Sequence, residues 1–510
     1  MRTKKFIYNV VSAALYQVFT LLFGLILPRL FIITYGSEIN GLISSVVQFV
    51  SYFQYIEFGL GATLIFALYK PLATEDYSQI NNITTTARKS YIKASLWYFM
   101  LVVGLSLIYP LVIKRESINL QATIVLIIVI GAYGALDFYT LAKYRVLLTA
   151  DQRYYVVNIT SIVALILNFI ITVVLIQLNA NIIIVKAVPL VTFFVRSSIL
   201  RAYVKKRYPN LSYCKAGDYK VENDKRWDAL IFQLSMSIMT SLPIVIVSII
   251  SLKSASVFSI YSMIFIGVTG ILSVFTMGSS ASFGNIIANN ESETLKKINN
   301  EYEFSLYFIE SILFSAALIL CTPFIQIYTK GIEDAVYSNS KYVLLFVIWG
   351  VIFNARLPQT AIVNGAGIYR ETRNANVIQI ILFIGLAVIL ANRMNIIIAV
   401  LIVMIIAAAY RTLDLIIVVN KTITKNNHYK SVLRLGRIFL IIFLAYIPFI
   451  YIIKITCITL TDWLICAGAV IIWCGIITIA INLIFDKQVL IESAKRLIAI
   501  TYKKNKTSGF

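Results

Sequence analysis

Charged residues are scarce in this sequence, and acidic residues are the scarcest among them. Of the 510 residues, 13% are Asp, Glu, Lys or Arg, and 23 acidic residues stand against 45 basic ones. A soluble protein of this length needs much more polar surface than such a composition can supply. The composition therefore excludes a soluble globular protein.

Residues that commonly carry out catalysis are also few. The single histidine, His428, falls in a segment expected to be a loop, which favours a solvated side chain. The five cysteines fall mostly within apolar runs and lack metal-ligand spacing, which indicates packing residues. The sequence contains no nucleotide-binding P-loop, GxSxG elbow or HExxH motif. It predicts a protein that is not an enzyme and does not hydrolyse ATP itself.

Long apolar runs make up most of the chain. Hydrophobic residues account for 59% of it, and the mean hydropathy is +0.84. A helix needs roughly 20 apolar residues to cross a bilayer. The sequence therefore predicts an all-α membrane protein with about fourteen transmembrane helices, over residues 6–34, 42–68, 91–113, 120–142, 155–178, 182–203, 227–251, 256–286, 303–328, 342–364, 375–391, 394–419, 436–458 and 462–485.

The basic residues lie mainly on one side of this predicted topology. With the N-terminus in the cytoplasm, 33 of the 45 Lys and Arg fall in cytoplasmic segments, seven fall outside, and five fall within helices. This bias follows the positive-inside rule and predicts that both termini are cytoplasmic. The net charge of +22 is thus explained by topology, without nucleic acid. The predicted outer loops are short, which disfavours a membrane polymerase or glycosyltransferase.

The two halves of the chain resemble each other at an offset of about 215 residues. Similar segments recur in the same order, such as 71–83 with 286–298 and 147–158 with 362–374. An even number of helices separates equivalent points, so the halves run in the same direction, as in transporters built from parallel repeats. We predict an N-terminal six-helix lobe (1–203), a cytoplasmic linker (204–226) and a second six-helix lobe (227–420). Two extra helices (421–485) and a basic cytoplasmic tail (486–510) follow.

Two stretches resemble a known family. "LPRLFIITYGSEINGLISSVVQFVSYFQYIEFGLGATLIFALYKPLA" (27–73) and "LLTADQRYYVVNITSIVALILNFIITVVL" (147–175) are similar to Wzx-like polysaccharide flippases of the multidrug/oligosaccharidyl-lipid/polysaccharide (MOP) exporter superfamily. The resemblance implies a MATE-like fold and translocation of an undecaprenyl-diphosphate-linked oligosaccharide from the inner to the outer leaflet of the bacterial cytoplasmic membrane. A polysaccharide polymerase and glycosyltransferases are the partners that this function implies. A multidrug/cation antiporter of the same superfamily and a peptidoglycan lipid II flippase are the alternatives.

Arg29 is the one functional position that this resemblance carries over. It lies near the outer end of the first predicted helix, directly after Pro28, which is expected to kink that helix. Arg29 either extends to the lipid headgroups or faces a central cavity and meets the diphosphate. The kink leaves its helix face undecided.

The second predicted helix carries a polar stripe. Gln48, Ser51 and Tyr55 recur at helical spacing, and Gln54 and Glu57 lie on the adjoining side. Polar groups in a membrane must find protein or water. The stripe is therefore either a cavity wall for substrate or a contact between helices.

Ionisable residues deep in a membrane are functional candidates. Arg356, with Asn354 beside it, is the deepest predicted cation and a candidate substrate-binding residue. Glu57, Asp137 and Glu310 are candidates for coupling transport to H⁺ or Na⁺; no other cofactor and no metal are expected. The other charged residues within the predicted helices are Lys186, Arg196, Arg411 and Asp414, of which the last two have the i, i+3 spacing of an ion pair.

Overall fold

The computed structural model describes residues 2–57, 60–114, 118–213, 226–276, 279–391, 393–453, 457–493 and 495. All regular structure in these residues is helical. The linker predicted over 204–226 and the tail predicted over 486–510 lie partly outside the described residues.

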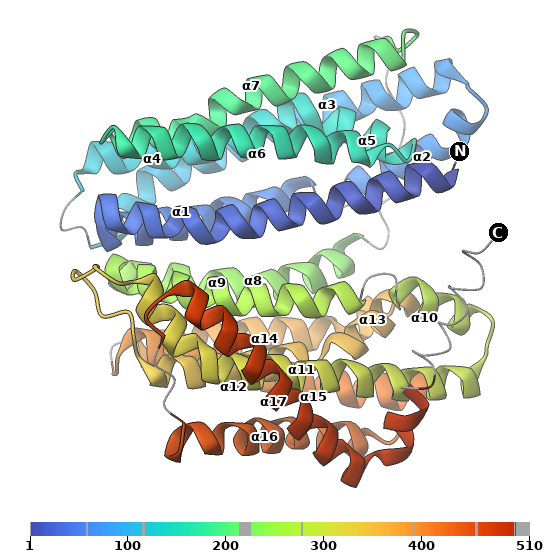
Figure 1. The fold of residues 1–510 in the computed structure, drawn as a ribbon. Helices are drawn as coiled ribbons and strands as arrows, with labels where there is room; N and C mark the ends of the chain where they lie inside the picture. The colour runs from blue at the N-terminus through green and yellow to red at the C-terminus, as the bar shows by residue number, and fades with distance from the viewer. Residues whose placement is uncertain are drawn as a thin grey trace. The chain divides into compact units, whose positions relative to one another are not determined.

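The chain forms two compact units. The first comprises Met1–Leu230 with Thr240–Ser259, and the second comprises Ile231–Met239 with Ile260–Phe510. The first unit contains α1 (Arg2–Phe53), η1 (Gln54–Glu57), α2 (Leu60–Ala73), α3 (Tyr77–Val112), α4 (Leu120–Leu136), η2 (Asp137–Leu141), α5 (Ala142–Ala150), α6 (Tyr154–Gln177) and α7 (Ile182–Arg207) (Figure 1).

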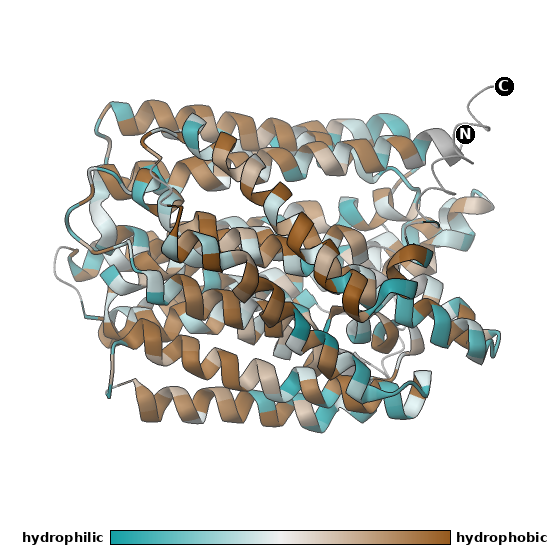
Figure 2. Cartoon of the chain, turned by 60° about the horizontal axis from the view of Figure 1, so that its bottom comes forward, coloured by the Kyte–Doolittle hydropathy of each residue, from teal (hydrophilic) through white to brown (hydrophobic). Residues whose placement is uncertain are grey.

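Two helices, α8 (Arg226–Ile250) and α9 (Leu252–Thr276), are divided between the units. The second unit continues with α10 (Ser279–Ala288), α11 (Ser292–Tyr328), α12 (Ser340–Asn354), α13 (Leu357–Ala366), α14 (Tyr369–Leu390), α15 (Ile396–Val419), η3 (Asn420–Thr424), α16 (His428–Tyr451) and α17 (Leu460–Phe485). Hydrophobic residues dominate these helices, and hydrophilic residues gather toward helix ends (Figure 2).

Thirteen helices in the described part of the chain are long and apolar enough to cross a membrane. The first of them, Ile7–Glu57, has 51 residues and would be about 76 Å long as a single helix, more than twice the roughly 30 Å of a bilayer core. At Gly36 the backbone is not helical (φ 84°, ψ 166°), which divides α1 into two arms. Counting the arms separately gives the fourteen predicted segments, and the all-α membrane fold is confirmed.

The two arms of α1 run in opposite directions. Along the first arm, Asn9 contacts the start of α6, and Tyr35 donates a hydrogen bond to the carbonyl of Ala180 beyond its end. Along the second arm, Ser45 bonds Tyr109 near the end of α3, whereas Glu57 bonds Tyr91 earlier in that helix. The first arm is thus parallel to α6 and the second arm is antiparallel to α3. Glycine at position 36 permits the reversal, because a positive φ is accessible to it without a Cβ clash.

Two membrane-spanning helices are interrupted at equivalent points of the two halves. Helix α4 passes into α5 through the π-helical turn η2, and α12 is separated from α13 by Ala355 and Arg356. The two interruptions are about 215 residues apart, which is the offset between the sequence halves. Each interruption places a charged residue, Asp137 or Arg356, within a span.

Candidate functional site

Glu57 is paired through both of its carboxylate oxygens. The hydroxyl of Tyr91 on α3 donates a 2.7 Å hydrogen bond to Oε1, and Nη2 of Arg145 on α5 lies 3.3 Å from Oε2. The short 3-10 turn η1 ends at Glu57 and carries the carboxylate toward these two helices. Three elements distant in the sequence therefore meet at one carboxylate.

Asp137 lies between two arginines. Arg145 Nη1 donates to its Oδ2 at 3.0 Å, and Arg196 Nη1 on α7 lies 3.3 Å from its Oδ1. The same Arg196 nitrogen donates to the hydroxyl oxygen of Tyr133 at 3.3 Å. Asp137 opens the π-helical turn η2, and such turns within α-helices are frequent at functional sites. Glu57, Arg145, Asp137 and Arg196 thus form one chain of alternating charge, named here the charge chain.

The charge chain lines a cavity of about 510 Å³ within the first unit. All four of its side chains contribute to the wall, and the other polar side chains in the lining are Tyr16, Gln54, Tyr133, Tyr154, Asn158 and Ser161. Side chains of the charge chain are 11–27% exposed, so they are half-buried yet open to the cavity. We call this cavity the polar chamber.

A second cavity of about 370 Å³ adjoins the polar chamber, since Gln54, Tyr133 and Gly134 line both. Its lining is more apolar and includes Ser51 and Lys186. The Lys186 ammonium lies 3.6 Å from the ring centroid of Phe31, a cation–π geometry that stabilises a charge in an apolar wall. The two cavities therefore share part of their walls, and charged residues line one of them while mainly apolar residues line the other.

One buried donor of the charge chain is unsatisfied. Arg196 Nε finds no hydrogen-bond partner among the described residues. A buried donor without a partner costs free energy, roughly 1–3 kcal/mol. Arg145 and Arg196 each present a planar fork of N–H groups, the geometry that binds phosphate or carboxylate groups through two parallel bonds. The chamber is thus equipped to accept an anion.

No known family profile matches the sequence, and no curated protein matches it either. Among solved structures, lipid II flippase MurJ in an inward closed conformation is similar with a TM-score of 0.61 and 15% identity, over 95% of this chain and 100% of that chain. An inward-facing multidrug resistance MATE family transporter of the MOP superfamily is similar with a TM-score of 0.59 and 14% identity, over 85% of this chain and 99% of that chain. The eukaryotic MATE transporter AtDTX14 is similar with a TM-score of 0.57 and 15% identity, over 86% of this chain and 98% of that chain. This chain has the MATE and MurJ fold.

Within the MATE and MurJ fold, several sequence-predicted residues come together and others do not. Ser51, Gln54, Glu57, Lys186 and Arg196 line the two adjoining cavities, as does Asp137. Arg29, Gln48 and Tyr55 are half-buried on α1 and η1 and are not among the residues that line these cavities.

Apart from Asp414, which is half-buried, the predicted residues of the second unit lie in its interior. Arg356 is 1% exposed, stacks on the ring of Phe353 at 4.0 Å, and leaves Nε and Nη2 without partners in the described structure. Asn354, next to it, donates to Thr269 and to the carbonyl of Gly350. Glu310 on α11 is 1% exposed and its Oε1 is unpartnered there too. Arg411 and Asp414 form an ion pair on α15.

Arg145, Tyr91 and Tyr133 are site residues that the sequence did not indicate. The sequence predicts a cytoplasmic segment at Arg145 because the apolar run ends near residue 142, yet α5 continues helix α4 to Ala150. A signal existed in the spacing of Asp137 and Arg145, which are eight residues apart and therefore about two turns apart on one helix. The two tyrosines resemble any aromatic residue of an apolar helix.

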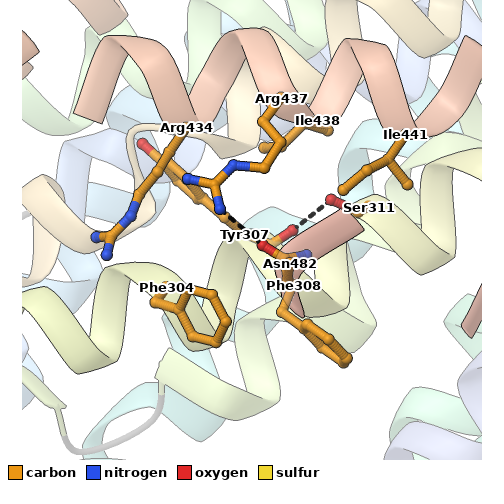
Figure 3. Close-up of a pocket in the computed structure, with 9 residues that line it drawn as sticks. All are labelled: Phe304, Tyr307, Phe308, Ser311, Arg434, Arg437, Ile438, Ile441 and Asn482. Carbon is orange, nitrogen blue, oxygen red and sulfur yellow. Dashed lines mark hydrogen bonds between the residues drawn. The ribbon is translucent and has the colours of Figure 1, made fainter. Parts of the chain in front are cut away.

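A second charged cluster joins α11, α16 and α17. Arg434 on α16 contacts Glu303 at 3.2 Å and Asp486 at 3.0 Å, and Arg437 contacts Asp486 at 2.7 Å and Asn482 at 3.0 Å. Figure 3 shows Arg437 directed toward Asn482 and the Arg434 guanidinium directed away from both. Arg434 and Glu303 are buried, so these bonds fix the two extra helices against α11.

Proposed function

We propose that this chain is a transporter of the MOP superfamily that moves an undecaprenyl-diphosphate-linked oligosaccharide from the inner to the outer leaflet of the bacterial cytoplasmic membrane. Surface polysaccharide assembly, served by a polymerase and glycosyltransferases, is the process that uses such a cargo. The observation that carries the proposal is the polar chamber, in which two arginines are held by two carboxylates inside a membrane-spanning unit.

The diphosphate competes with the carboxylates of the charge chain. In the structure each arginine is occupied by Glu57 or Asp137 at 3.0–3.3 Å. A diphosphate carries more charge and more acceptor oxygens than either carboxylate, and it matches the guanidinium fork. Binding of substrate therefore frees the carboxylates.

The freed carboxylates couple transport to an ion. A carboxylate that loses its arginine in a half-buried chamber is left with an uncompensated charge, which is costly. Binding of H⁺ or Na⁺ to Glu57 or Asp137 removes that cost. Release of the ion restores the bonds to Arg145 and expels the diphosphate, so cargo and ion bind together and leave together.

The remaining chamber wall suits a glycan. Gln54, Asn158, Ser161 and Tyr16 supply amide and hydroxyl groups, which exchange hydrogen bonds with sugar hydroxyls as water does. The adjoining apolar cavity, with Lys186 in its wall, accommodates the less polar part of the cargo. Both termini are cytoplasmic in this proposal, as the distribution of basic residues predicts.

A multidrug/cation antiporter is the second candidate, favoured by the likeness to MATE transporters. Two observations favour the flippase. The chamber presents two guanidinium groups beside its two carboxylates, and a guanidinium fork is suited to phosphate and not to an organic cation. The likeness to MurJ extends over 95% of this chain, against 85% for the inward-facing MATE transporter. A lipid II flippase would bind the same diphosphate group, and only the glycan of its cargo distinguishes it from a polysaccharide flippase.

A translocation assay tests the proposal. The purified protein is reconstituted into liposomes that contain a polyprenyl-diphosphate oligosaccharide with a fluorescent label on the sugar, and exposure of the label to a membrane-impermeant quencher is followed. We expect faster exchange with the wild type than with Arg196→Ala. Arg370→Ala, at an exposed position of α14, is the matched control and retains the wild-type rate. Export of ethidium without exchange of the labelled lipid would favour the antiporter instead.

A further inference from the structure

A third cavity lies in the second unit, between the first turns of α11 and the start of α16. Its volume is about 290 Å³, and all ten residues that line it are polar or charged. Four of them are basic (Lys296, Lys297, Lys430 and Arg434), and one, Glu303, is acidic. This composition contrasts with the surrounding helices, and nothing in the proposed transport cycle uses it.

The cavity sits outside the hydrocarbon region. Helix α11 has 37 residues, about 55 Å in length, whereas a bilayer core is roughly 30 Å thick. The polar first turns of α11, with Lys296 and Lys297, therefore extend beyond the core on the predicted cytoplasmic side. Lysines at this level meet the phosphate layer of the membrane and the solution beside it.

The single carboxylate in the wall is fully occupied. Glu303 Oε1 accepts from Arg434, and its Oε2 accepts from Ser431 at 2.8 Å and from Gln359 at 3.1 Å. Glu303 is 2% exposed, so it contributes little negative surface to the cavity. The charge facing the open space is therefore mainly that of the lysines, of which Lys296 lies 3.0 Å from Glu293 and Lys430 lies 3.9 Å from Asp486.

Arg434 supplies an independent indication of a ligand. It is 3% exposed, its Nε and Nη1 are bonded, and its Nη2 has no hydrogen-bond partner in the described residues. A buried guanidinium N–H is rarely left unpaired, since the lost hydrogen bond is not replaced. The start of α16 adds the positive end of a helix dipole to the same wall, while the backbone N–H groups of Tyr429 and Lys430 are bonded to Asn427.

We propose that this cavity is a binding site for a phosphate group. Lys297 and Lys430 provide the mobile charges, and Arg434 Nη2 provides a fixed donor behind them. Either the headgroup of an anionic phospholipid or a soluble phosphate carries that group. The site is distinct from the polar chamber of the first unit, and it does not depend on which cargo the protein transports.

Thermal unfolding of the full-length protein in neutral detergent tests the site. The probes are dihexanoyl phosphatidylglycerol, dihexanoyl phosphatidylcholine and inorganic phosphate, each titrated at constant ionic strength. We expect phosphatidylglycerol to raise the unfolding temperature of the wild type with saturation. The double variant Lys297→Gln/Lys430→Gln weakens the apparent affinity about tenfold or more, since two charge-assisted bonds are lost.

Lys421→Gln is the matched control, because Lys421 is exposed and does not line the cavity; its affinity stays within twofold of the wild type. Should the double variant prove unstable, Lys297→Gln alone, at an exposed position, gives the same comparison. Saturable stabilisation by inorganic phosphate with the same dependence on Lys297 identifies a soluble source, and stabilisation by phosphatidylglycerol alone identifies the lipid. An equal loss of apparent affinity in Lys421→Gln and in the double variant would overturn the proposal. So would the absence of stabilisation by both phosphatidylglycerol and inorganic phosphate.

Discussion

The guanidinium of Arg145 and the carboxylate of Glu57 lie 3.3 Å apart, although 88 residues separate them in the sequence. The contact joins η1 to α5, and the same guanidinium bonds Asp137 through its other terminal nitrogen. One cation thus bridges two carboxylates in the wall of a polar chamber. Whatever displaces this cation from one acid changes the electrostatics of the other.

The bridge predicts a graded response to substitutions of Arg145. Arg145→Ala leaves Glu57 and Asp137 half-buried without their shared cation, and we expect the free energy of unfolding to fall by roughly 2 kcal/mol, with transport at background. Lysine retains the charge but lacks the two separate terminal nitrogens that reach the two acids, so Arg145→Lys falls between alanine and wild type. Thermal unfolding and the translocation assay measure the two effects. Wild-type stability and transport in Arg145→Lys would show that bridging is unimportant.

Substitution of Glu57 tests whether this carboxylate couples transport to an ion gradient. Glu57→Gln keeps an oxygen for the Tyr91 hydroxyl and removes the titratable charge, so the unfolding free energy should change by less than about 1 kcal/mol. Transport by this variant is expected to proceed without responding to an imposed H⁺ or Na⁺ gradient. Translocation rates in liposomes with and without each gradient give the comparison. A wild-type gradient response in Glu57→Gln would assign coupling to another residue.

Much of the fold could be predicted from the sequence because membrane insertion imposes a strong pattern. Each crossing needs a long apolar run, and the basic residues fix its direction. Even the division of α1 into two arms was visible, since the polar segment around Gly36 separates two apolar runs. Hydropathy says less about interruptions within a crossing: the π-helical turn at Asp137 and the break at Arg356 are both flanked by apolar residues.

The candidate site was only partly predictable. The polar stripe and the deep charges drew attention to Ser51, Gln54 and Glu57, which line the cavities. The role of Arg145 was hidden because its partners are set by packing between helices, and a residue near the end of an apolar run looks like any cytoplasmic basic residue. Pairings such as Glu57 with Tyr91 depend on contacts between α3 and η1, which a single sequence does not encode locally.

Close packing of α10 against α13 depends on Gly365. A Cβ at this position would lie 2.5 Å from the carbonyl oxygen of Ser280 and 2.9 Å from the amide nitrogen of Gly284, and backbone atoms cannot move aside cheaply. Gly365→Ala is expected to lower the unfolding free energy by about 1–3 kcal/mol. Gly385→Ala is the control, since a Cβ there meets nothing within 4 Å in α14. Thermal unfolding distinguishes them, and equal stability of the two variants would argue against this helix contact.

The ionised carboxylate of Asp151 is expected to make the stability of the protein depend on pH in the acid range. Burial raises the pKa of its carboxyl, but hydrogen bonds from Lys5, Tyr208 and Arg153 at 2.6–2.8 Å outweigh burial and hold the pKa below its usual value. A pKa lowered by folding stabilises the protein above the unfolded value of about 3.9, and this contribution is lost as the pH falls through the lower folded value.

The corresponding measurement compares the wild type with Asp151→Asn across pH. We expect the variant to be less stable by roughly 2 kcal/mol between pH 5 and 8, and the difference to shrink below about pH 4. Glu293→Gln, at a side chain that is 85% exposed, serves as the control and shows little difference at any pH. A gap between wild type and Asp151→Asn that persists unchanged to pH 2 would contradict the assignment.

Substrate protection of the polar chamber tests the central claim most directly. In a cysteine-free background, Ser161→Cys places a thiol in the chamber wall, and Asn289→Cys places one at an exposed position outside it. The rate of labelling by a thiol reagent is measured with and without a polyprenyl-diphosphate oligosaccharide. Cargo bound in the chamber is expected to slow labelling at position 161 and to leave labelling at position 289 unchanged. Equal labelling at position 161 with and without saturating cargo would contradict it.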